Sequence, residues 1–156
     1  MVVVMLAGLL VAMAAVTAFP DDRARLHAEA DRLAQLWMMA HDEAQARGIP
    51  VLWEADAQGY RFVLRDGLQL VALEGDAALR ARDWTVTPME VIPVQGASAT
   101  QSSADRPVVR LMFVRAPAQD PVQVMLAWHD ARWLVAGDGL GRYEVLDPRP
   151  PAGATP

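Results

Sequence analysis

The fold depends on residues 20–50, PDDRARLHAEADRLAQLWMMAHDEAQARGIP. Pro20 and the acids after it favour a helix start, because proline lacks only an N–H that would have no partner and carboxylates complement the helix dipole. Gly48 and Pro50 end the segment. Between these signals, apolar residues recur at spacings of three and four, which predicts an amphipathic stem helix over residues 20–48. The residues expected to pack this stem are Leu26, Leu33, Trp37, Ala40 and Ala44.

Residues 1–19 contain no charged side chain, and only Gly8 and Thr17 interrupt the aliphatic run. At about 1.5 Å per residue, the run approaches the ~30 Å thickness of a hydrocarbon core. It lacks the basic start and the small-residue cleavage site of a secretory signal. We therefore expect a transmembrane half-helix that continues into the stem, giving one long helix over residues 1–47. Its membrane and assembly residues would be Met1, Val4, Leu6, Leu9, Leu10, Val11, Val16 and Phe19.

Beyond Gly48 the apolar residues recur at every second position, which is the period of a strand. The pattern predicts strands near residues 51–54, 60–65, 68–73, 84–87, 89–94, 108–114, 122–128, 132–136 and 142–146. We expect a polar, mobile loop at residues 95–107 and a disordered, Pro-rich tail at 147–156. The predicted fold class is α+β, with a long N-terminal helix packed on a small antiparallel β-sheet domain at residues 49–146.

The composition excludes several kinds of site. The chain has no cysteine, and therefore no disulfide, no thiolate metal site and no cysteine nucleophile. Its net charge of −5 opposes a general nucleic-acid binder. His27, His41 and His129 lie far apart in sequence, which favours surface or capping roles over a metal site. We predict no catalytic, cofactor-binding or metal-binding residue, no cofactor and no enzymatic activity.

Three stretches resemble one protein family. Residues 33–51, LAQLWMMAHDEAQARGIPV, are similar to the stem exit of the H-class minor pseudopilin of type II secretion, with leucines, then Ala-x-x-Glu-Ala, then Gly and Pro. Residues 60–62, YRF, fit the strand that follows, and residues 133–143, WLVAGDGLGRY, resemble the closing hairpin of that family. The Pro-Asp-Gly turn common before its penultimate strands is replaced here by residues 115–121, RAPAQDP.

The resemblance implies a pilin-like fold and a structural role. The protein would be a minor pseudopilin near the tip of the periplasmic pseudopilus, helping to export folded proteins. Its partners would be the other minor and major pseudopilins, the inner-membrane secretion platform, the lipid bilayer and the prepilin peptidase, which acts on the full-length precursor only. It would cross the bacterial inner membrane once, with its C-terminal domain in the periplasm. The family's leader and its Gly-Phe-Thr-Leu-Ile-Glu motif are absent, and we expect them upstream of Met1.

Two alternatives remain. The first is a type IV pilus minor pilin of the DNA-uptake type, which would need a cluster formed by Arg110, Arg115, Arg132 and Arg142 to hold phosphates. Scattered charges at strand edges are favoured over that cluster, so nucleic acid is not the expected partner. The second is a membrane-tethered periplasmic binding protein or enzyme, which would need a polar pocket.

Overall fold

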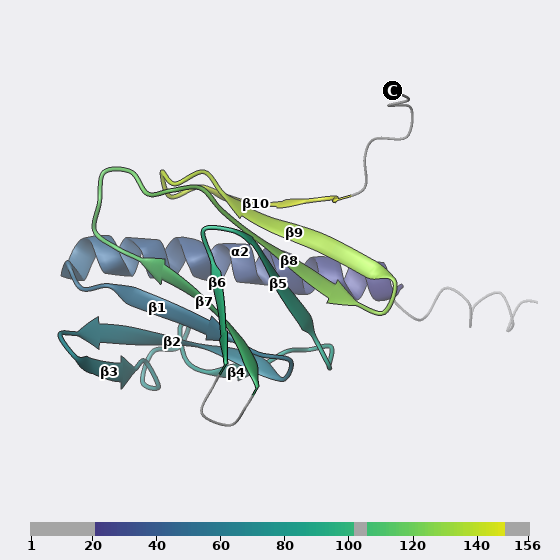
Figure 1. Ribbon diagram of the computed structural model, residues 1–156, viewed down its shortest axis with the longest axis horizontal. Coiled ribbons are helices and arrows are strands. Elements are labelled where there is room, and N and C mark those ends of the chain that lie inside the picture. Colours follow the sequence, from purple (N-terminus) through teal and green to yellow (C-terminus); the bar gives the residue numbers. More distant parts are fainter. Residues whose placement is uncertain (1–20, 102–105, 149–156) are drawn as a thin grey trace, which may run out of the picture.

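The computed structural model describes residues 21–101 and 106–148, beginning with helix α2, Asp22–Arg47 (Figure 1). The Asp21 side chain caps the helix by accepting a hydrogen bond from the Arg23 N–H at 3.4 Å. At the other end Gly48 has a φ of 67°, and its N–H donates to the Ala44 carbonyl at 2.9 Å. This is the usual left-handed glycine ending, so the signals read from the sequence set both ends of the helix.

The apolar stripe of α2 is buried completely. Six residues, including all five that were expected to pack the stem, are 0% exposed: Leu26, Ala30, Leu33, Trp37, Ala40 and Ala44. The described helix has 26 residues and is shorter than the helix expected over residues 1–47. Residues 1–20 of the expected helix lie outside the described part of the chain.

The strands form two antiparallel sheets. Sheet A has six strands in the order β3-β2-β1-β7-β6, with β4 beside β2. Its strands are β1 (Val51–Ala55), β2 (Gly59–Asp66), β3 (Gln69–Ala72), β4 (Arg82–Asp83), β6 (Ser98–Gln101) and β7 (Pro107–Phe113). Sheet B has four strands in the order β10-β9-β8-β5. Its strands are β5 (Glu90–Gln95), β8 (Val122–Trp128), β9 (Ala131–Gly137) and β10 (Tyr143–Leu146).

The α+β class is confirmed, because one helix packs on antiparallel sheets. The expectation of a small sheet domain is wrong, because the two sheets have six and four strands. Part of the difference lies in the segment expected to be a loop at residues 95–107, which contributes β6, paired with β7 at the edge of sheet A. All of β6 is exposed, so its polar residues carry no apolar alternation that would identify a strand.

The core lies between α2 and the two sheets. The helix runs along one side of both sheets (Figure 1). Trp37 is at its centre, with its ring centroid 5.1 Å from that of Trp53 in β1 and 6.2 Å from that of Phe113 in β7. From sheet B, the Tyr143 ring lies 6.0 Å away. Edge-to-face pairs of this kind add about 0.5–1.5 kcal/mol each beyond simple burial. One aromatic residue of the helix therefore joins both sheets.

The expected location requires a correction. Within residues 21–101 and 106–148, the structure has no helix that is both long enough and apolar enough to cross a bilayer. The prediction of a single-pass protein of the bacterial inner membrane is therefore wrong for the described part of the chain, whose helix α2 carries charged residues along its whole length. The apolar run at residues 1–19, with all of its expected membrane and assembly residues, lies outside the described residues, as does the tail from residue 149 onward.

Candidate functional site

Strand β1 carries one charged residue within an otherwise apolar sequence, VLWEA, and all five of its residues are buried. Side chains alternate between the two faces of a strand. Val51, Trp53 and Ala55 belong to the core beneath sheet A. Leu52 and Glu54 therefore point to the opposite face, which we call the outer face of sheet A.

Glu54 lies between two arginines on this outer face. The antiparallel register places Arg61 of β2 opposite it on one side and Arg110 of β7 on the other. Arg61 donates from Nε at 2.8 Å and from Nη2 at 2.6 Å to Oε2 of Glu54, and Arg110 donates from Nε at 2.7 Å to Oε1. Three adjacent strands therefore build one charged triad, which we call the Glu54 triad.

The Glu54 side chain is 5% exposed, whereas the side chains of Arg61 and Arg110 are 57% and 39% exposed. Burial alone would raise the pKa of Glu54, but the hydrogen bonds and positive charges of the two arginines outweigh burial and lower it. Glu54 is therefore ionised at neutral pH. The triad holds two positive charges and one negative charge, and both guanidinium groups reach solvent.

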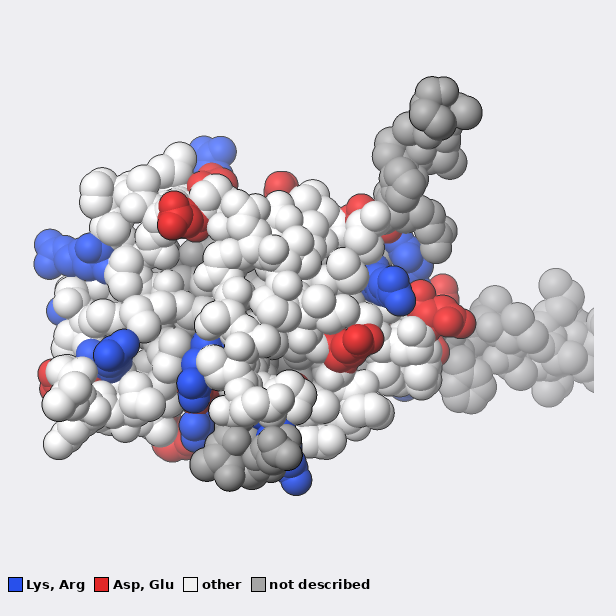
Figure 2. Space-filling view, viewed as in Figure 1, with Lys and Arg blue, Asp and Glu red and all other residues white. Residues whose placement is uncertain are grey.

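The triad lines one side of a groove with a volume of about 790 Å³. Two more arginines, Arg82 and Arg106, line the same groove together with Asp56 and Asp83. Arg82 is held in place by a hydrogen bond from Nη2 to the Ala77 carbonyl at 2.7 Å. Figure 2 shows basic side chains in a strip across this face, amid mostly uncharged surface. The groove thus combines four guanidinium groups with three carboxylates.

A smaller hollow of about 430 Å³ adjoins the groove and shares Arg110 with it. Its other lining residues are mainly apolar: Leu52, Leu68, Leu70 and Met112, with Arg65, Gly96 and Ser98. Leu68 is 99% exposed and Leu70 is 53% exposed, so both present apolar surface to solvent. Charged and apolar binding surfaces therefore lie next to each other on the outer face of sheet A.

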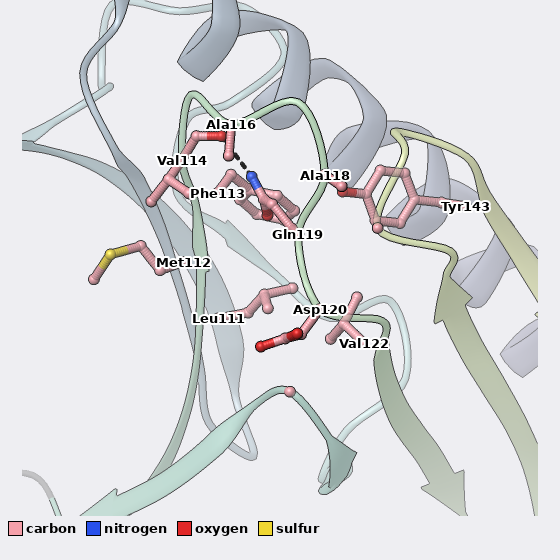
Figure 3. A pocket seen from close by; sticks show the side chains of 12 residues that line it. Leu111, Met112, Phe113, Val114, Ala116, Ala118, Gln119, Asp120, Val122 and Tyr143 are labelled. Carbon is pink, nitrogen blue, oxygen red and sulfur yellow. Dashed lines mark hydrogen bonds between the residues drawn. The ribbon is translucent and has the colours of Figure 1, made fainter.

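A third hollow, of about 470 Å³, lies under the β7–β8 connection (Figure 3). Several of the polar groups around it have hydrogen-bond partners within the protein. The Gln119 side-chain amide donates to the Val114 carbonyl, and Gln45 from α2 donates to the Ala116 carbonyl at 3.1 Å. These bonds hold the connection against the helix. The hollow is a packing feature of the loop rather than a reactive site.

Another buried polar contact joins α2 to the segment before β5. Glu29, which is 2% exposed, accepts hydrogen bonds from the Thr85 hydroxyl and from the Thr85 N–H, the latter at 3.3 Å. Nearby, burial raises the pKa of Tyr60 to about 12, and Glu29 adds to the increase while Arg32 and Arg82 oppose it. None of the three hollows described above is lined by Glu29. The contact ties a loop to the helix.

The four arginines considered for phosphate binding do not come together in one cluster. Arg110 belongs to the Glu54 triad. Arg115 lies next to Gly48 at the end of α2, and Arg132 and Arg142 belong to sheet B or to the turn before β10. The groove gathers a different set of arginines, drawn from β2, β4 and β7 and from the residue before β7.

The three histidines have separate local partners. His27 contacts Asp31 at 2.9 Å, one turn along α2, and His129 contacts Asp22 at 2.8 Å. His41 lies 3.5 Å from the Tyr143 hydroxyl. In the two described ranges, no group of three or more His, Asp or Glu side chains is arranged to hold a metal ion.

The Glu54 triad was not among the predicted sites, although the sequence carries one signal of it. Glu54 is the single charged residue in the buried strand VLWEA, and a charge in such a position needs partners. The identity of the partners, Arg61 and Arg110, depends on which strands pair with β1 and in which register. Arg110 is 56 residues away in sequence, and nothing local indicates that β7 pairs with β1.

The outer face of sheet A and the helix define an α+β domain with two distinct surfaces. Comparison of the chain with models of protein families, with curated proteins and with solved structures finds no match.

Proposed function

We propose that this chain is a structural minor pseudopilin of the H class in type II secretion. In this role α2 packs against the helices of neighbouring subunits near the tip of the pseudopilus, the sheets face outward, and the assembly helps to export folded proteins. Such a role needs packing surfaces and no catalytic residue. The sequence resemblance at residues 33–51 supports it, as does the arrangement of one amphipathic helix on antiparallel sheets.

The observation that carries the proposal is the uncovered face of α2. Opposite the buried stripe, the exposed positions include Met38 at 43% and Met39 at 48%. Small residues lie on the same side of the helix about two to three turns away, Ala28 before the methionines and Ala46 after them, and both are exposed. Small side chains let two helices approach closely, and methionine adapts to irregular partner surfaces. This face is suited to contact with another helix.

Co-purification tests the proposal. The full chain would be mixed with tagged pseudopilins of the same secretion system. Mild detergent would keep it dissolved, because residues 1–19 are mostly aliphatic and uncharged. Met39→Lys should lower recovery by at least about tenfold, because the ammonium group would be buried without a partner in the helix contact.

Val94→Lys is the matched control, since Val94 is 51% exposed and lies on β5, away from α2. It should leave recovery unchanged. Equal recovery of the parent chain and Met39→Lys would contradict the proposal, as would an absence of any complex with the parent chain.

The DNA-uptake alternative has less support. The arginines that it would use are dispersed over both sheets and the loops beside them, and three carboxylates line the groove in which Arg110 meets a different set of arginines. Those carboxylates would repel a phosphate backbone.

A further inference from the structure

The Glu54 triad is incomplete as an ion-pair cluster. A guanidinium group offers five N–H donors, so Arg61 and Arg110 together offer ten. Glu54 accepts two from Arg61 and one from Arg110. Among the described residues, neither arginine donates to any other acceptor. One positive charge and several donors remain directed at the groove, which suits an additional oxyanion.

Glu54 also fixes the direction of these donors. Its carboxylate is buried and ionised, and it contacts both guanidinium groups at 2.6–2.8 Å. Arginine side chains on a free surface lose considerable rotamer entropy when they bind a ligand. Here the protein has already restricted them, so an incoming anion meets a preorganised pair.

The apolar hollow lies one step away along the same strands. Leu52 precedes Glu54 by two residues on β1, and Met112 follows Arg110 by two residues on β7, opposite Leu52. Two residues along a strand span about 7 Å. An extended peptide places the side chains of residues i and i+2 on one side at the same spacing. A ligand with an acidic residue and an apolar residue two positions apart therefore matches both surfaces.

We propose that the outer face of sheet A binds an extended segment of a partner protein that carries one acidic residue among uncharged ones. A carboxylate of that segment pairs with Arg61 and Arg110 in the groove, and an apolar side chain two residues away enters the hollow lined by Leu52, Leu70 and Met112. The site goes beyond the proposed filament contact, because it lies on sheet A and does not involve the uncovered face of α2.

Charge selects this partner over a nucleic acid. Glu54, Asp56 and Asp83 line the groove, and the chain has a net charge of −5. A phosphate polymer would bring repeated negative charges close to these carboxylates, whereas one carboxylate flanked by uncharged residues would not. A phosphate polymer also has no aliphatic side chain for the hollow.

A displayed library of short, random peptides, selected on the immobilised full chain, tests the site. We expect enriched peptides to carry Asp or Glu two positions from Leu, Ile, Met or Phe. The best peptide would then be synthesised and titrated against variants by calorimetry. Arg110→Gln should weaken binding by at least about tenfold through loss of the charged partner. Arg132→Gln, on β9 of sheet B, is the matched control and should leave binding unchanged.

Met112→Glu keeps the proposal testable if Arg110→Gln disturbs folding. Met112 is 37% exposed and makes no ion pair, so the variant should fold, yet its new carboxylate would repel the acidic peptide and weaken binding by at least about tenfold. Enriched peptides without an acidic residue would overturn the proposal. So would unchanged binding by Met112→Glu, or a short DNA duplex that displaces the peptide.

Discussion

Substitution of Trp37 separates the effect of aromatic packing from that of an unpaired polar atom. Trp37 is 0% exposed and contacts aromatic rings of both sheets. Its indole Nε1 has no hydrogen-bond partner among the described residues. Trp37→Ala should therefore cost much, and Trp37→Phe should cost little, although both remove part of the same side chain.

The magnitudes follow from burial. A buried aromatic side chain removes about 150–250 Å² from water, which is worth about 4–6 kcal/mol as an upper bound. Replacement of buried tryptophan by alanine typically costs about 3–5 kcal/mol. In Trp37→Phe, the loss of ring volume is opposed by removal of the unpaired N–H, whose burial costs about 1–3 kcal/mol. We expect a net change within about 1 kcal/mol.

Urea unfolding followed by far-ultraviolet circular dichroism measures both changes. With a slope of about 2 kcal/mol per molar urea, Trp37→Ala should lower the midpoint by about 1.5–2.5 M. Trp37→Phe should move it by less than about 0.5 M. Equal destabilisation by the two variants would refute the assignment of an unpaired indole nitrogen. A loss below about 1 kcal/mol for Trp37→Ala would refute the central packing role.

Three further predictions concern charge, backbone geometry and surface. Glu54→Gln should destabilise the chain by about 1–2 kcal/mol at neutral pH, because Arg61 and Arg110 both lose their charged partner. Since the folded-state pKa of Glu54 is lowered from 4.5, its contribution to the free energy of unfolding is complete above about pH 4.5 and is lost as the pH falls through the folded pKa. Urea unfolding of the parent chain and of Glu54→Gln should therefore give equal stabilities in strong acid, and a difference that stays constant with pH would contradict this. Gly139→Ala should cost at least about 2 kcal/mol in thermal unfolding, because Gly139 has a φ of 79° and a Cβ there would lie 2.0 Å from the Gln119 carbonyl oxygen; an unchanged melting temperature would exclude that clash. Leu68 is 99% exposed, so Leu68→Ser should change the free energy of unfolding by less than about 0.5 kcal/mol and should reduce aggregation measured by light scattering. A large loss of stability would show instead that Leu68 packs against the protein.

The helix could be predicted from the sequence because its determinants are local. The capping acid Asp21, the apolar stripe and the left-handed Gly48 all lie within residues 20–50 and act on their own neighbours. The main strands could be predicted for the same reason, since alternation in residues 122–128 needs no distant partner to be visible.

The arrangement of the sheets could not be predicted. Register decides which strands become neighbours, and the pairing of Glu54 with Arg110 depends on contacts between distant parts of the chain. The exposed strand β6 lacked any apolar pattern, so a polar edge strand was mistaken for a loop. The arginines that do gather in the groove, Arg61, Arg82, Arg106 and Arg110, come from separate parts of the chain, so no local pattern in the sequence indicated them.

The path of the chain between the two sheets has a consequence for its synthesis. The chain leaves sheet A after β4, enters sheet B with β5, returns for β6 and β7, and crosses again to β8. Helix α2 is made early, yet it packs most extensively on β9 and β10, near the opposite end of the described chain. At a synthesis rate of about 5–20 residues per second, the apolar stripe of α2 would remain exposed for several seconds before β9 and β10 are synthesised. We expect the nascent chain to depend on a chaperone during this interval, and a fragment ending at Phe113 to remain unfolded.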